Sequence, residues 1–281
     1  MPRSSTLDNR VITRSPPPAP RTRTRFSRTL SRSRWGEYRR LLRFALEQGY
    51  AVLSLEAWLA DPGLAAGRPR LLLRHDVDQH PASALRMAAI EAELEVRSTW
   101  YFRWRTADAG VVAAIRDAGH AVGLHYETLT REVLRRGLGA ADAPALVPDA
   151  RVLLRRELAA FQQLHGPTQS ACPHGDTRAP GVHNGVLLLG EDWSSYGLRW
   201  DANAAMRQHR LDVWLTDRSL AEGGWKSKLD PLNLLIDHRS SILAVIHPNN
   251  WVSGPSLWCD RVLPGARRTK SDTPTLLQEK A

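Results

Sequence analysis

Apolar and polar positions along this chain follow two different periods. Short runs rich in Leu, Val and Ile have the length and composition of buried strands; they lie at 50–55, 71–75, 98–102, 121–125, 170–174, 195–200, 211–216 and 242–247. Longer segments have apolar residues three and four apart, as in amphipathic helices; they lie at 35–48, 82–94, 109–118, 148–164 and 182–189. Strands that alternate with helices through short connections predict parallel strands, in a barrel or a doubly wound sheet.

Several predicted strands each have an ionisable residue at their carboxyl end or just beyond it. The residues in this place are Asp76 and Asp78, His125, His174, Asp217 and His247. In a parallel β/α barrel the carboxyl ends of the strands gather on one face, where the active site is built. The pattern therefore favours a barrel with these residues on its polar face.

The strand at 71–75 ends in two aspartates, Asp76 and Asp78. Side chains two apart on a strand share a face, so we expect these two carboxylates to converge. Two like charges that close are costly unless a cation or a shared proton relieves the repulsion. A surface turn that carries acids is the simpler alternative. The other strand ends favour a metal-and-base site.

Two histidines, His120 and His125, flank the predicted strand at 121–125. Five residues span roughly 16 Å along a strand and put the two side chains on opposite faces, so they cannot ligate one ion. We expect His120, at the entry end, to make structural hydrogen bonds. His125, at the exit end, is a candidate ligand together with Asp78, because imidazole and carboxylate are usual ligands of Zn²⁺. Asp76 is then available as a general base.

The net charge of +10 is concentrated at one end of the chain. Residues 1–40 contain eleven arginines and two acidic residues, a net charge of +9. The remainder is nearly neutral, so we expect no nucleic-acid groove in the folded body and no nucleic-acid partner. Residues 1–34 lack an apolar period and are predicted to be a disordered tail, with polyanion binding or an organelle transit peptide as alternatives. We expect one barrel domain at 35–263 and a polar tail at 264–281.

Other features of the whole chain narrow the class of protein. Its hydrophobic fraction of 42% and charged fraction of 24% are ordinary for a soluble globular protein. It lacks both a run of about 18 apolar residues, needed to span a membrane, and the apolar core of a signal peptide. Cys172 and Cys259 do not have the spacing of a zinc motif or a disulfide framework. We therefore expect a cytoplasmic protein, of undetermined oligomeric state.

Three motifs resemble those of the polysaccharide deacetylases, carbohydrate esterase family 4. They are His75-Asp76-Val77-Asp78, Gly119-His120-Ala121-Val122-Gly123-Leu124-His125 and Ile246-His247-Pro248. The first is closest to a divergent branch with His-Asp-Val-Asp in place of the usual Thr-Phe-Asp-Asp. The resemblance extends over residues 35–262. It implies a distorted (β/α)7 barrel, a divalent metal and removal of an N-acetyl group from amino sugars.

The resemblance also implies a role for each matched residue. Asp76 matches the catalytic base of the family, and His247 matches its general acid. Asp78 and His125 match two ligands of the metal, for which Zn²⁺ is our expectation.

The sequence departs from the family in two places. The second motif of the family, His-Ser/Thr-x-x-His, supplies two ligands, and its second histidine position holds Leu129 here. Glu127 and His174 are the candidates for the missing ligand, because both lie near strand exits. The Arg-x-Pro-aromatic motif of the family is absent, and Ala171-Cys172-Pro173-His174-Gly175-Asp176 stands in its place. His174 and Asp176 are therefore open to three roles: positioning substrate, binding metal or shaping a loop.

These observations support three hypotheses of function. The first is a metal-dependent N-deacetylase acting on an N-acetylated sugar of a polysaccharide, glycolipid or glycosylated metabolite, with Asp176 and Trp251 contacting the sugar. The second, favoured by Leu129, is a metal-free barrel that binds glycans or acts as a scaffold. The third is nucleic-acid binding through the arginine-rich tail. The presence of all four matched site residues favours the enzyme.

Overall fold

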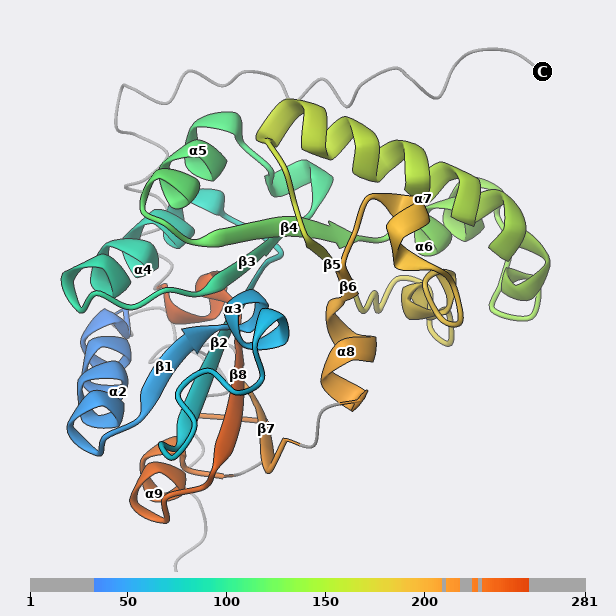
Figure 1. The fold of residues 1–281 in the computed structure, drawn as a ribbon. Coiled ribbons are helices and arrows are strands. Elements are labelled where there is room, and N and C mark those ends of the chain that lie inside the picture. Colours follow the sequence, from blue (N-terminus) through green and yellow to red (C-terminus); the bar gives the residue numbers. More distant parts are fainter. Residues whose placement is uncertain (1–32, 209–210, 218–223, 227–228, 253–281) are drawn as a thin grey trace, which may run out of the picture.

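The computed structural model describes residues 33–208, 211–217, 224–226 and 229–252. Eight strands form one sheet, and every ladder in it is parallel (Figure 1). The strands are β1 (Ala51–Ser54), β2 (Arg70–Val77), β3 (Thr99–Phe102), β4 (Ala121–Tyr126), β5 (Ser170–Pro173), β6 (Trp200–Asp201), β7 (Val213–Thr216) and β8 (Ser241–Ile246).

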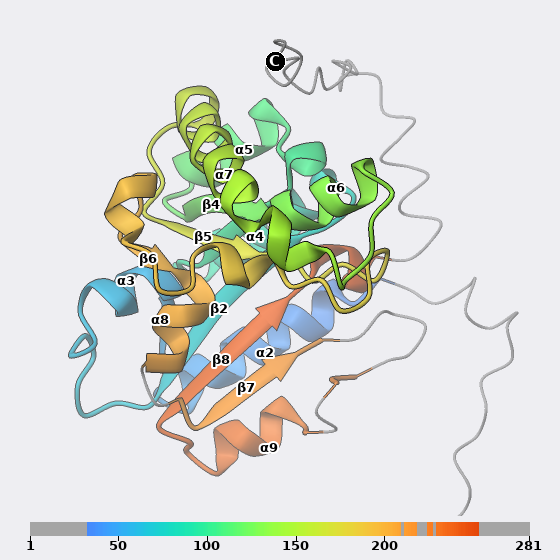
Figure 2. The ribbon, with the colours of Figure 1, turned by 90° about the vertical axis from the view of Figure 1, so that its right-hand side faces the viewer.

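The sheet curls into an incomplete barrel (Figures 1 and 2). Its strand order is β6-β5-β4-β3-β2-β8-β7, and β1 pairs with the first half of β2. Within the described ranges no ladder joins β6 to β7, so these two strands form the edges. Seven parallel strands in one curled path confirm the predicted distorted (β/α)7 architecture, with β1 as an additional strand.

Helices cover both sides of this curled sheet (Figure 1). The outer side packs against α2 (Trp35–Glu47), α4 (Pro81–Glu93), α5 (Ala109–Asp117) and α7 (Ala143–His165). The inner side packs against α3 (Leu55–Ala60) and α8 (Ala202–Gln208). The remaining helices are α6 (Thr128–Arg135), α9 (Pro231–Ile236) and the 3₁₀ turns η1 (Trp104–Thr106), η2 (Asn184–Leu187), η3 (Trp193–Tyr196) and η4 (Pro248–Trp251).

The two-residue period of the strands separates two apolar cores. On β2, Leu71 and Leu73 belong to the outer core, whereas Leu72 belongs to the inner one. Successive side chains of a strand point to opposite faces, so this alternation continues into the motif that follows. His75 is therefore on the outer face and Asp76 on the inner face, although they are neighbours in sequence.

Gly123 allows β4 and β5 to approach closely below the site. A Cβ atom at this position would lie 2.3 Å from the backbone oxygen of Ser170 and 2.8 Å from the Tyr101 ring. Both contacts are closer than non-bonded atoms tolerate, so only glycine fits this strand position. The approach brings the ends of β4 and β5, which carry two of the candidate ligands, side by side.

Some predicted elements were wrong. The helix expected at 182–189 is only the short turn η2, and glycines at 181, 185 and 190 explain the lack of a longer helix. The strand expected at 195–200 is the turn η3 followed by the two-residue strand β6. Helix α7 begins at Ala143, five residues before the predicted start at Pro148. Helices α3, α6, α8 and α9 were not predicted.

The predicted tails lie almost wholly outside the described residues, so their boundaries stay predictions. Arg34, assigned to the tail, instead contacts the folded body. Its backbone N–H donates to the Trp251 carbonyl at 2.8 Å, and its guanidinium lies 4.4 Å from the centroid of the Trp251 ring. None of the described helices is both long and apolar enough to cross a membrane.

Candidate metal and catalytic site

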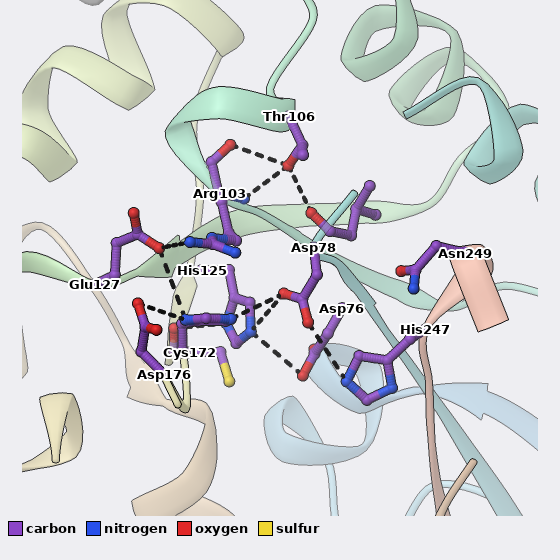
Figure 3. A network of polar contacts seen from close by, with 12 residues as sticks. Asp76, Asp78, Arg103, Thr106, His125, Glu127, Cys172, Asp176, His247 and Asn249 are labelled. Carbon is purple, nitrogen blue, oxygen red and sulfur yellow. Dashed lines mark hydrogen bonds and ion pairs between the residues drawn. The ribbon is translucent and has the colours of Figure 1, made fainter. Parts of the chain in front are cut away.

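The carboxyl ends of β2, β4, β5 and β8 bring five predicted site residues together (Figure 3). His125 Nε2 lies 3.6 Å from Asp76 Oδ2 and 3.5 Å from Asp78 Oδ1. His174 Nε2 is 3.4 Å from the same Asp78 oxygen. His247 Nε2 lies 3.9 Å from Asp78 Oδ2. The expected convergence of the two aspartates with histidines from other strands is confirmed.

Three overlapping groups of side chains have ligand atoms within 4.8 Å of one another. They are Asp76–His125–Cys172, Asp78–His125–His174 and Glu127–His174–Asp176. A cation already bonded to the carboxylate of a group competes with a metal ion for that charge. The ion pairs of each group therefore indicate which of the three fits a metal.

The first group already contains a cation, the guanidinium of Arg74. Arg74 Nε and Nη2 donate to the two oxygens of Asp76 at 2.8 and 2.7 Å, and Nη2 also lies 2.5 Å from Cys172 Sγ. Burial would raise the pKa of Asp76, but the charge of Arg74 outweighs it and holds that pKa well below its usual range. Arg74 thus already matches the charge of this carboxylate, which disfavours a metal ion in the group.

The third group is also neutralised by arginines. The Glu127 carboxylate forms an ion pair with Arg103 and lies 3.7 Å from Arg178. Arg178 binds both oxygens of Asp176, and this hydrogen bonding lowers the pKa of Asp176 to about 2. Both carboxylates of the group are therefore matched by guanidinium charges.

The middle group differs from the other two, because in the described ranges no arginine pairs with Asp78. Asp78 Oδ1 is buried and has no hydrogen-bond partner among the described residues, although two imidazole nitrogens lie within 3.5 Å of it. A buried carboxylate oxygen without a donor is costly. A divalent cation between this oxygen and the two nitrogens would remove that cost.

The hydrogen bonds of the imidazoles indicate which nitrogens are available to a metal. His125 Nδ1 lies 3.0 Å from the carbonyl oxygen of Cys172, so this nitrogen carries the proton and Nε2 presents its lone pair to Asp78. Burial lowers the pKa of His125 to about 4, against the charges of Asp76 and Asp78, which raise it. His125 is therefore neutral near pH 7, the form that binds metals.

The other nitrogen of His174 lies near two carboxylates without a hydrogen bond to either. Its Nδ1 is buried, 3.7 Å from Glu127 Oε2 and 4.0 Å from Asp176 Oδ2, and has no hydrogen-bond partner among the described residues, although the two negative charges favour a proton on this atom. Its Nε2 then presents a lone pair to Asp78. Carboxylates behind a ligating histidine are the usual outer shell of protein zinc sites. One carboxylate and two imidazoles are a ligand set that suits Zn²⁺.

On the other side of Asp78, His247 is held by a fully buried aspartate, Asp217. His247 Nδ1 lies 2.7 Å from Asp217 Oδ1, and Asp217 Oδ2 accepts from Trp251 Nε1 at 2.7 Å. Burial alone would lower the pKa of His247, but the hydrogen bond and charge of Asp217 outweigh it and raise this pKa. The sequence marked Asp217 only as a strand ending and gave no sign of this role.

Trp251 is a correction to the predicted sugar-contacting residues. The turn η4 directs its ring into the outer core, where it is 1% exposed and packs edge-on against Tyr38 with ring centroids 5.6 Å apart. A ring buried in this way offers no face to a sugar. Trp251 instead supports Asp217 through its indole N–H.

Comparisons with known proteins add little beyond this geometry. No protein-family model matches the sequence, and a search of curated proteins finds no match. Among solved structures, a family 4 carbohydrate esterase from Streptomyces lividans in complex with acetate is similar to this chain, with a TM-score of 0.37. The two are 18% identical, and the match covers 69% of this chain and 83% of that chain. We therefore base the assignment of function on the site and on the sequence motifs.

Proposed function

We propose that this protein is a metal-dependent hydrolase that removes an acetyl group from the nitrogen of an amino sugar. The observation that carries the proposal is the Asp78–His125–His174 group, whose carboxylate oxygen and imidazole lone pairs converge without a resident arginine. Asp76 and His247 lie on either side of this group. The arrangement would supply the parts of a hydrolytic site: three metal ligands, an ionised carboxylate and a histidine proton donor.

Asp78 Oδ1 and the Nε2 atoms of His125 and His174 would hold the ion, and Zn²⁺ matches this donor set. When bound, a divalent cation supplies Lewis acidity, which polarises a carbonyl group and lowers the pKa of a water molecule. His174 takes the place of the histidine that Leu129 replaces, since Leu129 is buried in the outer core. In this proposal Glu127 is not a ligand; it orients His174 from the Nδ1 side of the ring.

In the proposed hydrolysis, Asp76 is the general base. The two hydrogen bonds from Arg74 fix the plane of its carboxylate and keep it ionised, so it accepts a proton from the attacking water. Its Oδ2 is the oxygen near His125 Nε2 and therefore faces the ligand group.

His247 is the general acid. Asp217 holds the proton-bearing Nδ1 and raises the pKa of the imidazole, so Nε2 is protonated more readily than in a free histidine. Nε2 points towards Asp78 and the reacting group, and it donates its proton to the leaving amine. An amide needs this protonation because an unprotonated amine is a poor leaving group.

Support for an N-acetylated sugar comes from the sequence motifs shared with polysaccharide deacetylases. The site itself supports hydrolysis of an amide or an ester. We infer N-deacetylation because the proposed base, two of the proposed ligands and the proposed acid match positions in the motifs of that family. The alternative, a metal-free glycan-binding barrel, was favoured by Leu129 and has less support because His174 Nε2 lies 3.4 Å from Asp78 Oδ1, close enough to serve as a third ligand.

The experiment is a measurement of acetate released from N-acetylglucosamine and its oligosaccharides by the purified full chain. We expect activity to disappear after treatment with a chelator and to return when Zn²⁺ is added. Full activity of the chelated protein would exclude the metal. Absence of acetate release from every N-acetylated sugar by protein with one bound Zn²⁺ would exclude the proposed substrate class.

A further inference from the structure

Four carboxylates around the site have a cation of their own. The pairs are Asp76 with Arg74, Glu127 with Arg103, Asp176 with Arg178, and Asp217 with His247. The fifth carboxylate, Asp78, belongs to the ligand group. These four carboxylates are therefore matched locally, and a metal ion would match Asp78, so an additional cation beside them has no carboxylate of its own.

Arg105 is such a cation. It is exposed, and its Nη2 donates to the backbone carbonyl oxygen of Asp78 at 3.0 Å. Within the part of the chain that the structure describes, no carboxylate lies within 4.0 Å of its guanidinium. Burial and the neighbouring positive charges of Arg103 and Arg178 lower the pKa of Arg105, against the carboxylates of Glu127 and Asp78, which raise it, so Arg105 lies near the charged residues of the site.

The turn that carries Arg105 is fixed to the end of β2. Thr106 Oγ1 donates to the Val77 carbonyl oxygen at 2.5 Å and accepts from the Arg103 backbone N–H at 3.1 Å (Figure 3). Arg105 is thus held beside a proposed metal ligand by its own hydrogen bond and by that of its neighbour. A side chain placed in this way is better suited to recognition than a freely moving surface arginine.

A guanidinium has five N–H donors, and the bond to Asp78 uses one of them. The remaining donors can bind two oxygens of a carboxylate or phosphate side by side. A divalent ion on Asp78 adds to the positive charge at the mouth. A neutral sugar would leave the guanidinium charge unmatched, whereas an acidic sugar would match it.

We infer that Arg105 binds an anionic substituent, a carboxylate or a phosphate, on the sugar whose N-acetyl group lies at the ligand group. The inference rests on the proposed function, for which it names the substrate class: acidic N-acetylated sugars are preferred over neutral ones. Arg105 is the residue that determines this specificity.

The test is calorimetric titration of the zinc-loaded full chain with a set of matched sugars, together with acetate release from each. The set contains neutral N-acetylglucosamine, its 1- and 6-phosphates, and N-acetylmuramic acid, which carries a carboxylate. We expect at least one acidic sugar to bind about tenfold more tightly than the neutral one, the gain from one charge-assisted bidentate contact. The phosphates and the carboxylate distinguish the two anions.

The variant Arg105→Ala should reduce the ratio of acidic to neutral affinity to near one, and Arg105→Lys should retain part of it. A purely structural role, through the bond to the Asp78 carbonyl, would weaken both kinds of sugar equally and leave the ratio unchanged. Arg86→Ala, an exposed arginine on α4, is the matched control and should leave the ratio unaltered.

The outcomes separate this inference from the proposed function. Equal affinity for neutral and acidic sugars, or no sugar binding at all, would overturn the inference. Acetate release from all sugars at equal rates would support the proposed function alone. Tight binding of an acidic sugar that depends on Arg105, without acetate release, would support the inference and contradict the proposed reaction.

Discussion

Two buried polar clusters lie back to back across β2, and their residues are of the same types. The outer cluster centres on Glu91, which accepts hydrogen bonds from Tyr38 Oη, from His75 at 2.6 Å and from Ser98 Oγ at 2.6 Å. His120 joins it through Ser98, as expected for a structural hydrogen-bonder. The inner cluster centres on Asp78, whose Oδ1 has no hydrogen-bond donor among the described residues.

The hydrogen-bond partners of the central carboxylate, rather than the residue types, distinguish the structural cluster from the candidate site. The outer carboxylate is matched by donors from α2, from β2 and from Ser98 just before β3, and Glu91, His75 and Tyr38 are all 0% exposed. The inner carboxylate oxygen, Asp78 Oδ1, lies within 3.5 Å of two imidazole nitrogens, and the Asp78 side chain is 21% exposed. A buried carboxylate whose two oxygens both accept hydrogen bonds stabilises the fold, whereas one with an unsatisfied oxygen is suited to a ligand.

The largest expected effect is that of Asp76→Asn on the inner face. We expect turnover to fall by roughly 10³-fold, because an amide cannot accept the proton of the attacking water. The amide oxygen can still accept a hydrogen bond from Arg74, and bound zinc should be retained. Steady-state kinetics and elemental analysis measure both quantities.

Asp117→Asn, at an exposed position on α5, is the control. Unchanged turnover in Asp76→Asn would remove this residue from the reaction, and loss of zinc would make it a ligand.

On the outer face, Glu91→Gln should instead reduce stability. We expect a loss of about 3 kcal/mol in the free energy of unfolding at pH 7, because the buried carboxylate is the shared partner of three groups. Glu93→Gln, on the same helix in an exposed ion pair with Arg39, should cost less than about 1 kcal/mol. Urea unfolding measures both. Loss of bound zinc in folded Glu91→Gln would contradict the separation of the two clusters.

The pH dependence of this loss has a definite sign. Burial would raise the pKa of Glu91, but the charge and hydrogen bond of His75 outweigh it and lower this pKa. The carboxylate therefore stabilises the fold above its unfolded pKa of about 4.3, and this stabilisation is lost as the pH falls towards the lower folded value. The difference between the parent and Glu91→Gln should therefore shrink as the pH falls below about 4. A difference that grows in acid would contradict this assignment.

A smaller effect, on zinc affinity, is expected for Glu127→Gln, at the carboxylate near His174 Nδ1. As an orienting residue Glu127 should contribute roughly tenfold to zinc affinity, the lower end of what such outer carboxylates contribute. Glu132→Gln on the neighbouring helix α6, which also pairs with arginines but lies outside the ligand groups, should have no effect. Competition with a fluorescent zinc chelator measures both affinities. Complete loss of zinc in Glu127→Gln would show that Glu127 is a ligand after all.

The strands and the convergence of their polar ends could be predicted because a two-residue period and a strand terminus are local features. The choice between Glu127 and His174 could not, since it depends on the pairing of His125 with Cys172 across β4 and β5 and on arginines distant in sequence. Trp251 was misplaced for a similar reason. The turn after His247 sends its ring towards Tyr38 on α2, a contact that no sequence spacing indicates.

The proposed metal site is tested most directly by the zinc affinity of a variant that lacks the His174 imidazole. We expect His174→Ala to bind Zn²⁺ more than roughly a hundredfold more weakly than the parent, because it loses a ligand and not only an orienting group. His183→Ala, an exposed histidine nine residues further along, should bind it as the parent does. Circular dichroism and the thermal midpoint establish that both variants are folded. Parental zinc affinity in folded His174→Ala would contradict the assignment of Asp78, His125 and His174 as the metal site.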